Sequence, residues 1–233
     1  MSFLPSFRLR LPLGAPPHKG PRPNWPDDGA PETIFTHIYR TNRWRDKESR
    51  SGPGSNLRQT HVIRQALPQV VRELGCKTLL DAPCGDFFWL SRVALDVERY
   101  WGVDVVAALV EENQKNYGNE VRHFLKLDLI TDPLPKADLV FCRDCLVHFP
   151  CADVFRALRN IQASGSTHLL TTTFPDEDTN EEIPMGLWRP LNLQAEPFHL
   201  PPPLRLINEG CTHRHSKHPD KSLGLWQLAA LGL

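Results

Sequence analysis

KTLLDAPCGDFFWLSRVALDVERYWGVD, residues 77–104, is the stretch that decides the fold of this 233-residue chain. An apolar run ends in Asp81 and is followed by the tight turn Pro83–Asp86. A second apolar run ends in Asp104, and aromatic and apolar residues near 87–95 stand between the two runs. This order predicts a strand, a turn, a helix and a second strand, with an acidic residue closing each strand.

The position of Asp104 predicts a ligand site. In open α/β sheets, ligands bind beyond the carboxyl ends of the strands, where the strand order reverses. An acid that ends the second strand, roughly 20 residues after the first turn, can accept hydrogen bonds from ribose hydroxyls. We therefore expect a cofactor that contains adenosine.

The rest of the chain extends this pattern into an α/β fold. Strands and helices alternate, which predicts a Rossmann-like, mostly parallel sheet with helices on both faces. Two closing apolar runs, Leu204–Asn208 and Leu223–Ala230, are joined by a link too short for a crossover helix, so we expect an antiparallel pair. The predicted strands lie near 77–82, 99–104, 122–128, 137–143 and 167–174, and the predicted helices near 87–95, 105–117 and 150–162.

The N-terminal third falls into two parts. Residues 1–31 hold eight of the 22 prolines and predict an extended arm, while 32–233 are expected to form one domain. Within 32–75, helical spacing appears around 31–45 and 56–74, where Pro68 predicts a kink or break and Gly75 a C-terminal cap.

Composition narrows the classes of partner. Lys plus Arg and Asp plus Glu both number 27, and this zero net charge argues against a nucleic-acid partner. The apolar runs are of strand length and interrupted, which argues against a membrane partner. Six cysteines, several of them in strand patterns, predict reduced thiols in a cytoplasmic protein. A small-molecule substrate is the remaining expectation, and the sequence carries no signal of oligomeric state.

The strand ends together resemble the class I S-adenosylmethionine (SAM)-dependent methyltransferase family. The resemblance rests on Asp81, Gly85, Asp104 and the third strand end Lys126–Leu129, and the closing strand pair matches the seven-stranded sheet of that family. The segments DAPCGD, CRDCLVHF, TTTFP and RPLNL resemble a bacterial-type subgroup. The topology covers about residues 60–233, and the specific motifs cover 79–144.

The resemblance implies roles for individual residues. Asp104, with Val105 after it, would bind the ribose hydroxyls, and Asp128 and Leu129 would meet the adenine amine. Arg143 and Asp144 would lie beside the transferable methyl group and the substrate. Backbone groups of the turn would lie along the methionine part of the cofactor, at Asp81, Ala82, Pro83, Cys84, Gly85 and Asp86.

The turn departs from the family pattern of an acid followed by three alternating glycines. Pro83 and Phe87 stand at the outer glycine positions, so the methionine end of the site is expected to be built differently. An NAD-type site fits less well, because its pyrophosphate would meet Asp86 at the start of the predicted helix. That acid suits a cofactor with an ammonium group.

Asp144 and His148, four residues apart in CRDCLVHF, are the predicted catalytic residues. On a helical turn they would share a face, so that Asp144 could orient His148 as a base toward a hydroxyl or amine. Alternatively, Asp144 caps the next helix and His148 only packs. Positioning alone can also supply much of the rate of a methyl transfer.

Two segments are expected to bind the substrate. Residues 175–203 contain seven prolines and predict an irregular lid, or alternatively a structural wrap over the sheet edge. Trp188 is a candidate stacking wall, Arg189 a clamp for a carboxylate or phosphate, and Asn192 a further contact. The resemblance implies that an N-terminal helical cap, 32–75, covers the pocket, with Tyr39, Trp44 and the adjacent Arg43 and Arg45 closing over it.

No metal site is predicted. Cys142 and Cys145 lack a second cysteine pair, and the run from Cys211 to His218 lies in a polar connection. The resemblance implies methyl transfer to an oxygen, or next a nitrogen, of a small polar metabolite, sugar-like or anionic. A protein or peptide methyltransferase and a catalytically silent SAM-binding partner subunit remain alternatives.

Overall fold

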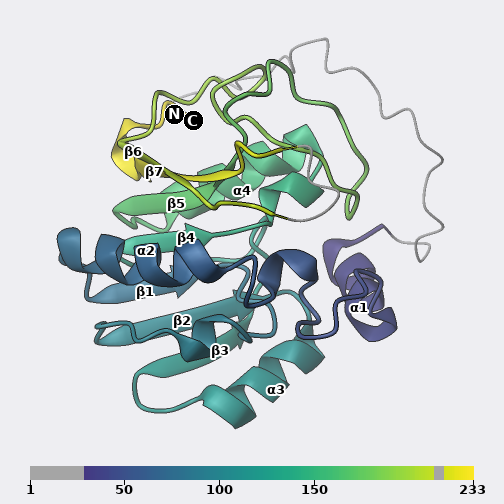
Figure 1. Cartoon of the computed structure of the whole chain (residues 1–233), viewed down its shortest axis with the longest axis vertical. Coiled ribbons are helices and arrows are strands. Elements are labelled where there is room, and N and C mark those ends of the chain that lie inside the picture. Colours follow the sequence, from purple (N-terminus) through teal and green to yellow (C-terminus); the bar gives the residue numbers. More distant parts are fainter. Residues whose placement is uncertain (1–28, 213–217) are drawn as a thin grey trace, which may run out of the picture.

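A seven-stranded sheet forms the centre of the molecule (Figure 1). The computed structural model describes residues 29–212 and 218–233. The strands are β1 (Thr78–Asp81), β2 (Arg99–Asp104), β3 (Arg122–Lys126), β4 (Leu139–Cys142), β5 (His168–Thr173), β6 (Arg205–Asn208) and β7 (Ser222–Gln227).

The strand order is β3-β2-β1-β4-β5-β7-β6. Strands β1 to β5 pair in parallel, whereas β7 pairs antiparallel to both β5 and β6. The predicted fold class is therefore confirmed, including the closing antiparallel pair. The order reverses at β1, between β2 and β4, so the carboxyl ends of these strands form the expected crevice.

Helices cover both faces of the sheet, as predicted. One apolar layer contains side chains of α1 and α4, and a second contains side chains of α2 and α3. Figure 1 shows α2 crossing one face and α1 standing apart beside the carboxyl ends of the strands. The helices are α1 (Pro31–Thr41), α2 (His61–Glu73), α3 (Ala107–Tyr117) and α4 (Cys151–Ala163), with short 3-10 turns at Pro53–Ser55, Leu90–Arg92, Leu146–His148 and Leu228–Ala230.

Helix α2 ends as its sequence predicts but is not broken at Pro68. It runs from His61 through Pro68 to Glu73, although a proline nitrogen cannot donate to the carbonyl four residues before it. Gly75 then adopts a left-handed φ of 62°. This conformation lets the Cys76 amide donate to the Val71 carbonyl at 2.9 Å, which closes the last turn.

The predicted helix near 87–95 is wrong. The connection between β1 and β2 contains only turns and the short 3-10 segment Leu90–Arg92. Its aromatic side chains pack inward instead. The Phe87 ring lies 5.2 Å from the rings of both Tyr100 and Phe124, and Trp89 packs edge-on against Phe141. Packing of these rings against the sheet overrides the local helical pattern.

The irregular segment 175–203 packs onto the domain. It contains no helix, as its prolines predict, and Leu191 and Leu193 are fully buried in the same apolar layer as α4. The Asn180 side-chain amide donates to the carbonyls of Asn192 and Glu196, at 2.9 and 2.7 Å. Much of this segment is therefore a structural wrap.

Across residues 29–212 and 218–233, none of the helices has both the length and the apolar character needed to cross a membrane. Of the arm predicted at 1–31, residues 1–28 lie outside the described residues.

Candidate active site

A cavity of about 440 Å³ lies at the carboxyl ends of the parallel strands. It is bounded by the sheet on one side and by α1 and the loop that follows α1 on the other. This is the predicted crevice. Most predicted site residues line it, namely Tyr39, Trp44, Asp81, Ala82, Pro83, Cys84, Gly85, Asp86, Asp104, Val105, Asp128, Leu129, Arg143, Asp144, His148 and Trp188.

The turn after β1 is held against β2 by its own backbone. The Cys84 amide donates to the Val103 carbonyl at 2.8 Å, and the Gly85 amide donates to Asp104 Oδ2 at 3.2 Å. Gly85 and Phe87 both adopt left-handed φ angles, 54° and 53°. Phe87 thus has the kind of conformation that a glycine would favour, stabilised by the packing of its ring.

Asp104 lies between the turn and the start of α3. Its Oδ1 accepts from the Val106 amide at 3.0 Å and its Oδ2 from Gly85, while the residue is 8% exposed in the cavity wall. Burial raises the pKa of Asp104 to about 6, and the bonds from Val106 and Gly85 oppose that rise. Each oxygen retains accepting capacity. The carboxylate can therefore receive two hydroxyl donors from the cavity.

Asp81 has a different environment, although it also ends a strand. Its Oδ2 accepts from the Tyr100 hydroxyl at 2.6 Å, and the residue is 3% exposed. Burial raises the pKa of Asp81 to about 8, although the bond from Tyr100 opposes this. Asp81 thus supports the turn from beneath with its side chain.

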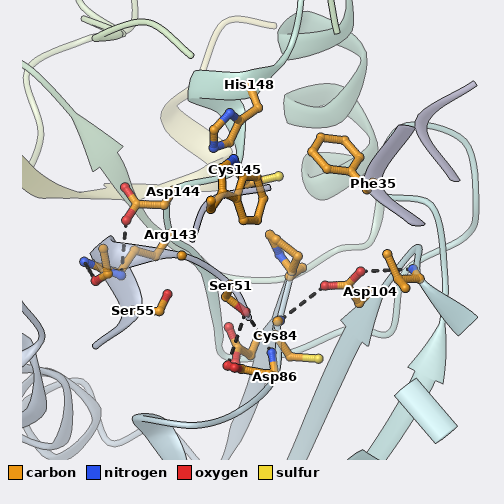
Figure 2. A pocket seen from close by; sticks show the side chains of 18 of the residues that line it. Phe35, Ser51, Ser55, Cys84, Asp86, Asp104, Arg143, Asp144, Cys145 and His148 are labelled. Carbon is orange, nitrogen blue, oxygen red and sulfur yellow. Dashed lines mark hydrogen bonds and ion pairs between the residues drawn. The ribbon is translucent and has the colours of Figure 1, made fainter. Parts of the chain in front are cut away.

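Asp86 joins the turn to the loop that follows α1, as Figure 2 shows. Its carboxylate accepts from Ser49 Oγ at 2.9 Å, from the Arg50 amide at 2.7 Å and from Ser51 Oγ at 3.2 Å. In return, the Asp86 amide donates to Ser51 Oγ at 2.9 Å. The expectation that Asp86 opens a helix is corrected here. Its carboxylate instead fixes the position of residues 49–51.

Asp128 and Leu129 follow β3 on the far side of Asp104. Asp128 Oδ1 accepts from the Ile130 amide at 2.8 Å, and its own amide donates to Asp132 Oδ2 at 2.8 Å. Leu129 is 7% exposed, and its carbonyl accepts from the Asn160 side chain. The loop after β3 is therefore fixed where an adenine ring was predicted to bind.

Four charged side chains form a cluster beyond β4. Arg143 Nη2 and Nε donate to Glu209 Oε2, at 2.6 and 3.1 Å, and Nη1 lies 3.2 Å from Asp144 Oδ2. Lys221 Nζ donates to Asp144 Oδ2 at 2.7 Å and lies 3.4 Å from Glu209 Oε2. The two cations and two carboxylates balance. Arg143 is therefore committed to partners within the protein.

Asp144 is the member of this cluster that is most open to the cavity. Its side chain is 23% exposed, compared with 10% for Lys221 and 4% for Arg143. Burial opposes its ionisation, but the two cations outweigh burial and hold the pKa of Asp144 well below its usual range. Its φ of 52° is uncommon for a non-glycine residue. The charged form of Asp144 is therefore favoured at neutral pH.

The predicted pairing of Asp144 with His148 is wrong for this structure. His148 Nδ1 donates to the Leu187 carbonyl at 2.8 Å, and Asp144 bonds to the two cations. A carbonyl can only accept, so Nδ1 carries the proton and Nε2 keeps a lone pair. The ring stacks on Trp44, with centroids 5.3 Å apart. Burial lowers the pKa of His148, although the Leu187 bond opposes this.

The predicted substrate residues separate into two groups. Tyr39, Trp44 and Trp188 line the cavity, and Trp188 is 47% exposed. Arg189 is 1% exposed, lies outside the cavity wall and donates to the Phe149 carbonyl at 2.8 Å. The predicted Arg189 clamp is therefore wrong for this structure, because neighbouring residues in the wrap point to opposite sides. Asn192 likewise bonds within the wrap, to the Glu177 carbonyl.

Several lining residues escaped prediction. Phe35, Glu209, Lys221 and the loop around Arg50–Ser55 line the cavity. Residues 49–55, SRSGPGS, have the Gly, Pro and Ser content of a loop, but no local pattern assigns this loop to the cofactor turn. A Cβ atom on Gly54 would lie 2.7 Å from Asp144 Oδ2, so glycine permits the loop to approach the cluster.

Comparison with known proteins identifies the fold. No family model and no curated protein matches the sequence. The magnesium protoporphyrin IX methyltransferase from Synechocystis PCC 6803, solved with bound SAM, aligns at 17% identity and a TM-score of 0.53, over 85% of this chain and 96% of that one. The chain has the fold of the class I SAM-dependent methyltransferases.

A second methyltransferase has a similar fold at comparable distance. Human N-acetylserotonin methyltransferase, in complex with SAM, aligns at 16% identity and a TM-score of 0.51, over 85% of this chain and 59% of that one. The methyltransferase domain of bacterial CtHen1-C aligns at a TM-score of 0.44 and 15% identity, over 51% of this chain. This chain spans 66% of that domain, and a similarity at this TM-score is too weak to support an inference.

No group of metal-ligating side chains is found within residues 29–212 and 218–233. Of the run from Cys211 to His218, residues 213–217 lie outside the described residues. The part of that run that is described points to other contacts, because His218 Nδ1 lies 2.8 Å from Glu177 Oε1.

Proposed function

We propose that this chain binds SAM and transfers its methyl group to an oxygen, or next a nitrogen, of a small polar metabolite. The observation that carries the proposal is a cavity at the point where the strand order reverses. The turn after β1, Asp104 and Asp128 all line this cavity. The methyltransferase fold supports the same reading.

The residues present fit the cofactor. The cavity volume of about 440 Å³ is within the usual range of small-molecule sites, about 300–1,000 Å³. Asp104 would accept the ribose hydroxyls, and the apolar side chains of Val105 and Leu129 would face the adenine ring. The turn and residues 50–54, which line the cavity, would lie along the methionine part. The cofactor supplies a methyl group on a sulfonium, which needs no covalent help from the protein.

His148 would act on the methyl acceptor. The Leu187 carbonyl fixes its tautomer, so Nε2 can take a proton from a hydroxyl or amine. Burial lowers its pKa and keeps the ring neutral at neutral pH. The stacked indole of Trp44 holds the ring in position. The rest of the rate would come from holding the acceptor and the cofactor together.

Two measurements on the full chain test the proposal. Calorimetry should show binding of SAM and of S-adenosylhomocysteine, whereas absence of binding would overturn the proposal. Tritium from methyl-labelled SAM should then appear in a small-molecule extract. Label in peptides alone would favour a protein methyltransferase, and binding without any transfer would favour a silent SAM-binding subunit.

A further inference from the structure

The acceptor end of the cavity has a distinct charge arrangement. Beyond β4, Asp144 faces the cavity, while Arg143 and Glu209 lie behind it at 4% and 1% exposure. Lys221 is bonded to Asp144 and is 10% exposed. A molecule at this end therefore meets a carboxylate first, and the nearby cations are already paired.

Two of the polar groups at this end, the Asp144 carboxylate and the His148 ring, present acceptors to the cavity. Asp144 is held ionised by two cations, so it cannot donate. His148 donates through Nδ1 to Leu187 and presents an accepting nitrogen. Asp144 Oδ1 is buried and has no hydrogen-bond partner among the described residues, so a donor that reached it would satisfy an otherwise unpaired acceptor. Both groups call for donors on the substrate.

The cationic side chains of the cavity wall do not provide a free partner for an anionic substrate at this end. Of the described residues that line the cavity, Arg143 and Lys221 are bonded to carboxylates, and the third cation, Arg50, lies beside the cofactor turn, where its amide bonds to Asp86. A carboxylate or phosphate at the acceptor end would lose hydration without gaining an unpaired cation.

We infer that the methyl acceptor is a neutral or cationic hydroxy or amino compound, recognised by Asp144, and not an anion. This inference rests on the proposed function and excludes the anionic alternative among the acceptors that the sequence led us to expect. The aromatic rings of Trp44, Phe174 and Trp188 in the same wall suit an acceptor with an apolar face. In transfer, the acceptor oxygen or nitrogen forms a bond to the methyl carbon, the sulfur–methyl bond breaks, and the acceptor proton passes to His148 Nε2.

The test sorts labelled products by charge. The full chain and methyl-tritiated SAM are incubated with a small-molecule extract, and the products are separated by ion exchange at pH 7. Label in the neutral and cationic fractions supports the inference when it exceeds that of a control without protein, which contains the cationic labelled SAM alone, and when it is stable to mild alkali, since a methyl ester formed from an anionic carboxylate would also be neutral. Label mainly in the anionic fraction overturns it while leaving the proposed function intact. Binding of SAM with no label in any fraction overturns both.

Two matched variants sharpen the test. Asp144→Asn removes the carboxylate charge and leaves the cations in excess, so labelling of neutral and cationic acceptors should fall by about 10–100-fold. Lys221→Met removes a cation and keeps the carboxylate, so the anionic fraction should stay unlabelled. The Kd of each variant for S-adenosylhomocysteine must first lie within about threefold of the wild-type Kd. This is well below a tenfold change, which corresponds to about 1.4 kcal/mol. Equal labelling of all fractions by wild type and Asp144→Asn would overturn the role of Asp144.

Discussion

Replacement of Asp104 by asparagine should weaken cofactor binding. Asparagine keeps one accepting oxygen but places an NH2 group where the other oxygen accepts from Gly85 or Val106. A hydrogen bond to a charged group contributes about 1.5–3 kcal/mol. The substitution loses one such bond and leaves the backbone N–H of Gly85 or Val106 facing the NH2 group of the asparagine, donor against donor. It should therefore cost about 2–3 kcal/mol and raise the Kd about 30–150-fold.

The same carboxylate predicts the pH dependence of binding. Burial raises the pKa of Asp104 to about 6, and the ionised form is the one that accepts two hydroxyls. Ligand binding therefore favours ionisation. Affinity should be full above pH 6 and should fall as the pH drops through that value, by up to about tenfold per pH unit. The Asp104→Asn variant should lack this dependence.

Calorimetric titration with S-adenosylhomocysteine between pH 5 and 8 measures both effects. Asp153→Asn is the matched control, because Asp153 lies on α4, outside the cavity wall, and pairs with Arg156 on the surface. Its affinity should equal that of wild type. If Asp104→Asn binds within about threefold of wild type, less than 1 kcal/mol, and wild-type affinity is flat from pH 7 to 5, the ribose must be assigned to another residue.

Three further predictions concern other side chains. His148→Gln should lower kcat by about 10²–10⁴-fold with little change in SAM affinity, and an unchanged kcat in this variant would remove the base role. In wild type, kcat at saturating SAM should fall only at pH values below the usual histidine pKa, because burial lowers the pKa of His148. Asp86→Asn should release residues 49–51 and speed hydrogen exchange of the Arg50 amide, measured by mass spectrometry, whereas unchanged protection would show that the loop is held elsewhere. Burial raises the pKa of Asp81 to about 8, so between about pH 4 and 8 Asp81 ionises only in the unfolded chain and the free energy of unfolding of wild type should decline. The gain in unfolding free energy of Asp81→Asn over wild type, measured in urea, should therefore grow across this pH range, and a constant difference would contradict the prediction.

The sheet could be predicted from sequence because its signals are local. Strands β1, β4 and β5 contain short apolar runs, and the three acids Asp81, Asp104 and Asp128 lie at or just beyond strand ends. Parallel strands align their carboxyl ends, so local runs are enough to gather these acids at one edge. Strand identity and the closing antiparallel pair follow from the same reasoning.

The chemistry at the acceptor end could not be read in this way. The partner of Arg143 is Glu209, 66 residues away, and neither residue has a pattern that points to the other. Arg189 was expected to bind substrate because of its charge, yet its position in the wrap turns it inward. The direction of a side chain in an irregular segment depends on tertiary packing, which no sequence period encodes.

The missing helix after β1 explains why the loop before α2 has become part of the site. In a doubly wound fold, the N-terminus of the first helix supplies donors beside the turn. Here the turn leads into packed aromatic rings, and Asp86 instead binds Ser49, Arg50 and Ser51. The same loop brings Gly54 to Arg143, whose Nη2 donates to its carbonyl at 2.9 Å. One loop therefore spans both ends of the cavity, so binding at the cofactor turn and the position of the acceptor-binding cluster share a structural element.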